Sequence, residues 1–263
     1  MRLTIILISS LILFNSCQLL QPLQKANEID IYPLKTSKIK FQQEWQISLY
    51  HKRISDFRKL PIGFKKIVFL GNSITEGAKS WNKKLDQKNL VNRGISGDIT
   101  EGVLARLGEI YYYKPLGVFL LIGINDIFDS NIENRDKITP NYVANNIIKI
   151  AKNIEKYCPY TKIYIQTILP VNLLKYKEIK GSAPAHEISL NDQINNINNI
   201  LKNNTNTYQN IEIIDLHNTF KNEQGVLNPD LSHDGIHLND LGYDIWVKTI
   251  KKTVIDLNSD FLN

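Results

Sequence analysis

A serine, a histidine and an aspartate in this sequence could together form an activated nucleophile. The tripeptide Gly71-Asn72-Ser73 directly follows the apolar run 67–70. His237 stands three residues after Asp234. Residues at i and i+3 lie side by side in one helical turn. The Asp234 carboxylate could therefore orient one imidazole nitrogen of His237 and leave the other to take the proton of Ser73. Such a group would attack a carbonyl carbon.

Acyl transfer also requires hydrogen-bond donors for the negative oxygen that develops on the carbonyl. The backbone N–H of Ser73 could be one donor. Gly97 could offer a second backbone N–H, because glycine permits close approach, and the side-chain amide of Asn125 could be a third. Each residue also has an ordinary interpretation: Ser73 could only cap a helix, Asn125 could only form a turn, and Asp126 could form a turn or cap a short helix. The chemistry therefore depends on distant segments meeting.

Short apolar runs that alternate with helical periods could bring these segments together. The runs occupy residues 66–70, 89–92, 117–122, 162–168 and 211–214. Continuous apolar strands separated by helices are typical of a parallel sheet covered on both faces. Functional residues gather at the carboxyl ends of such strands. We therefore expect one α/β domain, a three-layer α/β/α sandwich around a five-stranded parallel sheet.

Helical periods are marked by apolar residues three or four positions apart. We expect one helix to carry Val103, Leu107 and Ile110, and another to begin at the cap and proline of Thr139-Pro140. An earlier stripe lies within residues 38–60 and consists of Phe41, Trp45, Leu49, Tyr50, Ile54 and Phe57. We interpret this stripe as one helix packed on the domain core.

Four short blocks occur in the order seen in the SGNH hydrolase (GDSL esterase/lipase) superfamily. They are Gly71-Asn72-Ser73, Gly97 within NRGISGD, GIND at 123–126 and DGIH at 234–237. From residue 65 to about 250 the chain resembles this superfamily. The likeness is greatest to acylhydrolases related to the platelet-activating-factor acetylhydrolase catalytic subunit and to carbohydrate acetylesterases.

The resemblance implies a flavodoxin-like fold and a role for each matching residue. Ser73 would be the nucleophile, His237 the base and Asp234 its orienting partner. Ser73, Gly97 and Asn125 would donate to the oxyanion. Asn72 departs from the pattern, because many members have Asp there; the departure leaves the three catalytic positions intact.

The activity we expect is that of a cofactor-free serine esterase that works through an acyl-enzyme. Family analogy favours a short acyl group, namely acetyl, on a small-molecule or glycan ester. Three alternatives stay open: a lysophospholipase or other lipid acylhydrolase, a sugar O-acyltransferase, and a glycan-binding protein that kept the fold without the chemistry. Loops 126–139 and 169–187 are expected to shape the substrate sites, although their lysines Lys175, Lys177 and Lys180, with Tyr176, are interpreted as solvated.

The first seventeen residues indicate an export signal. Met1-Arg2 is positive, and the apolar run 3–14 is shorter than the roughly 20 residues of a comfortable membrane span. A small residue before Cys17 resembles the lipobox of bacterial lipoproteins, which implies lipid attachment at Cys17. Ordinary cleavage and an uncleaved anchor remain alternatives.

The expected organisation follows from this signal. Residues 1–17 would be the signal and lipobox, 18–37 a polar tether, and 38–263 the hydrolase domain. The protein would be an exported envelope lipoprotein, periplasmic or on the cell surface, or a secreted protein. Contact with a membrane would occur only through the lipid anchor.

The composition fits one packed domain and argues against several other classes. The chain has 263 residues, 43% hydrophobic and 22% charged. The net charge is +6, but no basic block exceeds three residues, so we expect no nucleic-acid partner. The HExxH-like string that begins at His186 has Leu190 in its last position, and Cys158 reads as a small buried hydrophobe, so we expect no metal. The oligomeric state stays open.

Overall fold

The computed structural model describes residues 31–131, 133–205 and 208–259. At its centre lies a five-stranded, wholly parallel sheet in the order β2-β1-β3-β4-β5. The strands are β1 (Ile67–Gly71), β2 (Leu90–Gly94), β3 (Gly117–Leu121), β4 (Lys162–Gln166) and β5 (Ile211–Ile214). This order is the flavodoxin-like one, so the predicted fold class is confirmed.

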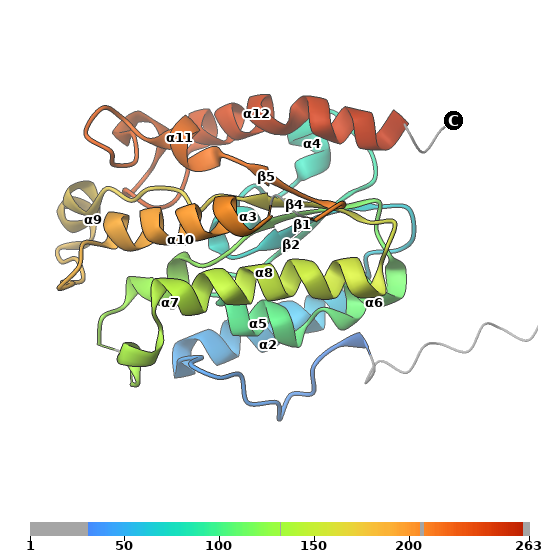
Figure 1. The fold of residues 1–263 in the computed structure, drawn as a ribbon, viewed down its shortest axis with the longest axis horizontal. Coiled ribbons are helices and arrows are strands. Elements are labelled where there is room, and N and C mark those ends of the chain that lie inside the picture. The colour runs from blue at the N-terminus through green and yellow to red at the C-terminus, as the bar shows by residue number, and fades with distance from the viewer. Residues whose placement is uncertain (1–30, 132, 206–207, 260–263) are drawn as a thin grey trace, which may run out of the picture.

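Helices cover both faces of the sheet and form the connections between its parallel strands. They are α2 (Glu44–Lys59), α3 (Ser73–Gly77), α4 (Trp81–Leu85), α5 (Thr100–Ala105), α6 (Gly108–Tyr113), α7 (Ile124–Phe128), α8 (Pro140–Tyr157), α9 (Leu173–Lys180), α10 (Leu190–Thr205), α11 (Leu216–Phe220) and α12 (Asp240–Ser259), with short 3-10 turns at Arg135–Lys137 and Pro229–Leu231. In Figure 1, α4 and α12 lie above the sheet and α2, α5 and α8 lie below it.

Aromatic side chains join the sheet to the upper helix layer. Phe69 of β1 stacks on Trp81 of α4 with ring centroids 3.9 Å apart, and Trp81 meets Trp246 of α12 edge-on at 4.9 Å. The Trp246 indole N–H donates to the Gln166 side chain at 2.7 Å. All residues of β1 and β3 are buried, as expected for strands covered on both faces. The strand that leads to Ser73 is therefore packed on both faces.

The helix expected to carry Val103, Leu107 and Ile110 is divided in two. α5 ends where the Arg106 N–H bonds the Val103 carbonyl, and α6 begins at Gly108. All three apolar residues are nevertheless buried. The break lets the Arg106 side chain turn back to Asp98, as described below.

Two residues that precede position 38 contact the domain. Ile31 and Tyr32 are buried, and the Tyr32 hydroxyl donates to the Phe57 carbonyl at 3.1 Å and to Glu109 Oε1 at 2.6 Å. Part of the segment expected as a tether therefore packs on α2 and α6. The signal segment and Cys17 lie outside the described residues. Among the helices of the described segments, none combines the length and apolarity needed to cross a bilayer.

Candidate active site

Ser73 lies where β1 ends and α3 begins, at the carboxyl edge of the sheet. The strand ends at Gly71, where a β-carbon would stand only 2.2 Å from the Leu121 carbonyl oxygen. Asn72 then caps α3: its side-chain oxygen accepts the Ile74 N–H at 3.0 Å. Ser73 is thus not the capping residue, and its hydroxyl is left to face other groups.

Ser73, His237 and Asp234 are brought together in one hydrogen-bonded chain. Ser73 Oγ lies 3.0 Å from His237 Nε2, and His237 Nδ1 lies 2.9 Å from Asp234 Oδ2. The Asp234 side chain is 8% exposed, whereas that of His237 is 43% exposed. The histidine therefore stands between a buried carboxylate and the solvent side of the serine, the order that a base and its orienting partner require.

The Asp234–His237 pair is held by a tight turn rather than by a helix. The second carboxylate oxygen of Asp234 accepts the backbone N–H groups of Ile236 at 3.1 Å and His237 at 2.8 Å. Gly235 has φ +88°, and a β-carbon there would lie 2.2 Å from the Asn172 carbonyl oxygen. Only glycine therefore fits the turn without moving the backbone at Asn172.

The environment of Asp234 favours its ionised form. Burial raises the pKa of this carboxyl, but hydrogen bonds from the His237 side chain and backbone outweigh that effect, so the pKa lies below its usual range. Lys180 Nζ adds positive charge 3.7 Å from Asp234 Oδ2. The interpretation of Lys180 as a solvated charge is thus incomplete, since it faces the aspartate of the site.

Gly97 and Asn125 face the same cavity as Ser73 and His237. Gly97 has φ +78°, and the loop that carries it is joined to β1 by the Ile95 N–H, which donates to the Gly71 carbonyl at 3.0 Å. The Asn125 side-chain amide donates to the Asp98 carbonyl at 2.9 Å, which fixes the direction of its Nδ2. The predicted catalytic and oxyanion residues therefore converge on one edge of the sheet: Ser73, Gly97, Asn125, Asp234 and His237.

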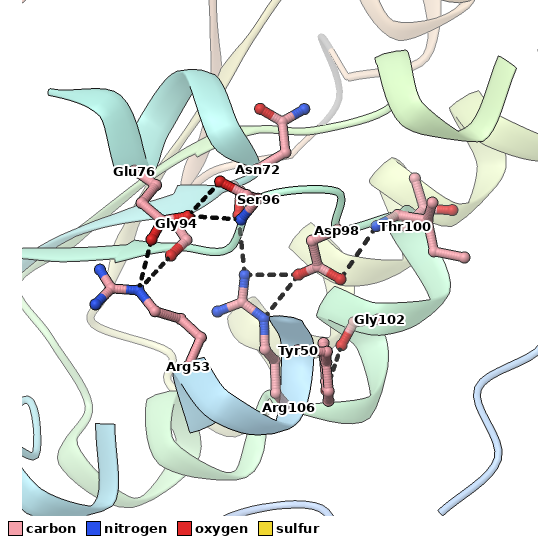
Figure 2. A network of polar contacts seen from close by, with 12 residues as sticks. Tyr50, Arg53, Asn72, Glu76, Gly94, Ser96, Asp98, Thr100, Gly102 and Arg106 are labelled. Atoms are coloured by element: carbon pink, nitrogen blue, oxygen red, sulfur yellow. Dashed lines mark hydrogen bonds and ion pairs between the residues drawn. The ribbon is translucent and has the colours of Figure 1, made fainter. Parts of the chain in front are cut away.

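Polar contacts that sequence reasoning missed hold the Gly97 loop from two sides (Figure 2). Arg106 donates from Nε and Nη2 to Asp98 Oδ2 at 2.9 Å, and both side chains are almost wholly buried. On the other side, Glu76 Oε2 of α3 accepts the Ser96 N–H and hydroxyl, each at 2.6 Å. Arg53 of α2 lies 3.2 Å from Glu76 Oε1 and donates to the Gly94 carbonyl. Charged residues around NRGISGD were the one sequence signal for this network.

Asp126 is neither a turn former nor a simple cap within its own helix. It is buried, and its carboxyl accepts the Thr100 hydroxyl at 2.6 Å and the Thr100 N–H at 3.1 Å. It therefore supports the start of α5 from across the sheet edge. Burial, offset in part by the Thr100 hydrogen bonds, raises the pKa of Asp126 to about 7.

Asp126→Asn is expected to gain stability relative to the wild type as the pH rises. The folded wild type keeps a proton on Asp126 up to a pKa of about 7, while the unfolded chain ionises near 3.8. The contribution of Asp126 is thus complete below the unfolded value and is lost as the pH rises through the folded value. Urea unfolding at about pH 4.5 and about pH 8 should shift the difference by roughly 1 kcal/mol or more.

The control for this measurement is Asp136→Asn, which changes an exposed acid on the same stretch of chain. That variant should track the wild type at both pH values. A constant difference between Asp126→Asn and the wild type across the range would contradict the raised pKa.

The site opens into a cavity of about 410 Å³. Aromatic, polar and aliphatic side chains line it beside the catalytic candidates; they include Trp45, Gln46, Phe128, Asp129, Tyr176 and Ile236. The prediction that Trp45 and Leu49 pack in the core is wrong, because they are 54% and 39% exposed. The core face of α2 is formed by Gln46, Tyr50, Ile54 and Phe57. The solvated interpretation is wrong for Tyr176, which packs edge-on against Phe128 at 5.3 Å. Lys175 bonds the carbonyls of Pro229 and Ser232.

Within residues 31–259, apart from the three positions left undescribed, no three His, Cys, Asp or Glu side chains group as metal ligands. Cys158 is buried as a free thiol, whose Sγ lies 3.5 Å from the Ile110 carbonyl oxygen. His186 Nε2 lies 3.0 Å from the Phe128 carbonyl and takes no part in a metal cluster.

Comparison with known proteins identifies the family of this chain. The model of the GDSL-like lipase/acylhydrolase family matches residues 69–245. Platelet-activating factor acetylhydrolase IB subunit alpha1 of Rattus norvegicus is 24% identical over 217 residues, which cover 80% of this chain and 82% of that protein.

Solved structures extend the likeness to the fold. A GDSL-like lipase from Bacteroides thetaiotaomicron is 22% identical, covers 79% of this chain and 97% of its own, and has a TM-score of 0.62. A variant of an acetyl-xylooligosaccharide esterase from Geobacillus Stearmophilus is 18% identical, covers 74% and 96%, and has a TM-score of 0.53. Because the family model spans most of the domain, the chain belongs to the GDSL-like lipase/acylhydrolase family, as the SGNH hydrolase resemblance predicted, and is a carboxylic ester hydrolase.

Proposed function

We propose that this protein is a serine esterase that removes short acyl groups, acetyl above all, from a carbohydrate. The observation that carries the proposal is the hydrogen-bonded chain from Ser73 Oγ through His237 to Asp234, with contacts of 3.0 and 2.9 Å. It ends in a cavity that also holds Gly97 and Asn125. The serine hydroxyl, the histidine that can take its proton and the aspartate that orients the histidine could therefore act together on one bound ester.

In the acylation step, Ser73 Oγ attacks the ester carbonyl carbon while His237 Nε2 takes the hydroxyl proton. The N–H groups of Ser73 and Gly97 and the Asn125 amide donate hydrogen bonds to the developing oxyanion. The tetrahedral species then collapses, the bond to the alcohol oxygen breaks, and the proton on His237 passes to that oxygen. The ionised Asp234 stabilises the imidazolium throughout.

In the second step, water replaces the alcohol. His237 Nε2 takes a proton from water, the hydroxide oxygen bonds to the acyl carbon, and the same oxyanion donors act again. Collapse returns the proton to Ser73 Oγ and releases the carboxylic acid. The 43% exposure of the His237 side chain leaves it open to water, as this step requires.

The size and lining of the cavity support the substrate class. About 410 Å³ is near the lower end of small-molecule sites and suits an acetyl group with a sugar ring better than a long acyl chain. One structural neighbour acts on acetylated xylooligosaccharides, and its fold is shared here. The proposal also includes export, with Cys17 lipidated at the bacterial envelope; residue 17 lies outside the described residues, so only the sequence supports that part.

Acetate release from a panel of esters tests the proposal. Acetylated xylooligosaccharides and acetylated monosaccharides should be hydrolysed faster than lysophospholipids or octanoyl esters. A fluorophosphonate should label Ser73, as mass spectrometry of the peptide would show. Faster release from lysophospholipids would favour lipid acylhydrolysis, and an acetylated acceptor formed under excess sugar would favour transfer. A folded protein without labelling or turnover would indicate a binding protein.

A further inference from the structure

We infer that Trp45 forms a platform on which the pyranose ring of the leaving alcohol stacks during deacetylation. The inference deepens the proposed function and rests on it. It assigns a specificity-determining role to α2, a helix that precedes the part of the chain matched by the family, residues 69–245.

Trp45 stands at the rim of the catalytic cavity. It is 54% exposed, whereas the two other tryptophans, Trp81 and Trp246, are at most 1% exposed. A β-carbon built on Gly97 would lie 2.7 Å from Cζ3 of the Trp45 ring. The indole therefore contacts the glycine that we propose as an oxyanion donor and extends from there into solvent. An alcohol leaving the ester carbon would pass along this ring.

The ring is held in place rather than free on the surface. Its indole N–H donates to Gln43 Oε1 at 2.9 Å. The Tyr50 hydroxyl of the same helix bonds the Gly102 carbonyl at 3.0 Å, and Arg53 reaches Glu76 and the Gly94 carbonyl (Figure 2). These contacts tie α2 to both ends of the Gly97 loop. An aromatic ring that is half exposed, held by a hydrogen bond and placed on the lining of the catalytic cavity can serve as a binding surface for a ligand.

The surroundings of the Trp45 ring suit a sugar. A sugar offers a flat C–H face to an aromatic ring and hydroxyls around its edge. Here Gln43, Gln46 and Asp129 line the cavity beside the indole and can bond such hydroxyls. Phe128 and Tyr176, which pack edge-on against each other, line the same cavity, so binding of a choline-type cation is tested separately below.

Direct binding can be measured without turnover in the Ser73→Ala variant. Because Trp81 and Trp246 are buried, iodide should quench mainly Trp45 fluorescence. An acetylated xylooligosaccharide should change that fluorescence and protect it from iodide. The Ser73→Ala, Trp45→Phe double variant should lose the signal. Protection by phosphocholine or by octanoate instead of the sugar would overturn the assignment, as would no protection by any of them.

Kinetics separate a platform from a structural role. Trp45→Ala should lower kcat/KM for the acetylated xylooligosaccharide by about tenfold, mainly through KM, while ethyl acetate, which has no ring, stays within about twofold. Trp45→Phe should recover most of the loss. Leu49→Ala, exposed on the same helix but outside the catalytic cavity, is the matched control and should change neither substrate.

The outcomes keep the two proposals apart. Equal losses on both esters in Trp45→Ala, or no loss on the sugar ester, would overturn the platform. A wild-type enzyme that hydrolyses ethyl acetate through Ser73 but no acetylated sugar would refute the proposed substrate class. Iodide protection in Ser73→Ala decides the platform separately, because it requires no catalysis.

Discussion

Replacing Ser73 with alanine is expected to lower acetate release by at least about a thousandfold. The variant keeps the backbone N–H of residue 73, Gly97 and Asn125, so any remaining rate reflects oxyanion stabilisation and binding. It loses the oxygen that lies 3.0 Å from His237 Nε2, and with it the acyl-enzyme. Removing the His237 imidazole should cost a similar factor, because the two groups act as one unit.

Hydrolysis of p-nitrophenyl acetate by purified protein measures this loss. Ser48→Ala, which removes an exposed hydroxyl from α2, serves as the control and should keep the wild-type rate. Circular dichroism and the unfolding midpoint should be unchanged in Ser73→Ala, since the side chain is small and partly exposed. A folded Ser73→Ala protein with near-normal turnover would refute the nucleophile assignment.

Replacing Arg106 with leucine is expected to destabilise the fold by about 3–5 kcal/mol. The Arg106 and Asp98 side chains are 3% and 0% exposed, and Arg106 Nη2 also donates to the Gly71 carbonyl at 3.1 Å. Leucine would leave the Asp98 carboxylate buried without its partner. Burial already raises the pKa of Asp98 to about 6 although Arg106 opposes that shift. Without the guanidinium, the folded state would hold the proton more strongly still.

The sign of the pH effect follows from that shift. The unfolded chain ionises Asp98 near its ordinary pKa of 3.8, so a folded state that needs the proton loses stability as the pH rises. The deficit of Arg106→Leu should thus be smaller at about pH 5 than at about pH 8. Urea unfolding followed by tryptophan fluorescence gives both values.

Two further variants test the cause. Arg53→Leu breaks a pair whose side chains are 28% and 30% exposed, so it should cost at most about 1 kcal/mol. Adding Asp98→Leu to Arg106→Leu should recover part of the loss, because it removes the unpaired charge. A loss below about 1 kcal/mol in Arg106→Leu, unchanged with pH, would show that the pair does not carry this stability.

The sequence by itself determined the sheet and the residues able to do chemistry. Strands that are buried on both faces appear in the sequence as apolar runs, so β1, β3 and β4 could be located from these runs alone. The carboxyl ends of parallel strands meet at one edge, which is why Ser73, Asn125 and the DGIH block could be grouped from their positions along the chain. These inferences depend on local patterns and on the handedness of crossovers.

The tertiary structure alone decided which face of α2 is buried and what holds the loop at Gly97. Trp45 and Leu49 lie beside the buried face of α2, which contains Tyr50, Ile54 and Phe57. Apolar residues therefore occur on more than one face of this helix, and their spacing cannot show which face is buried. The Arg106–Asp98 pair depends on a helix break that apolar spacing does not record. Ile31 and Tyr32 join the domain, and the Tyr32 hydroxyl finds its partners 25 and 77 residues away. Contacts between distant segments leave no periodic mark in a single chain, and only packing reveals them.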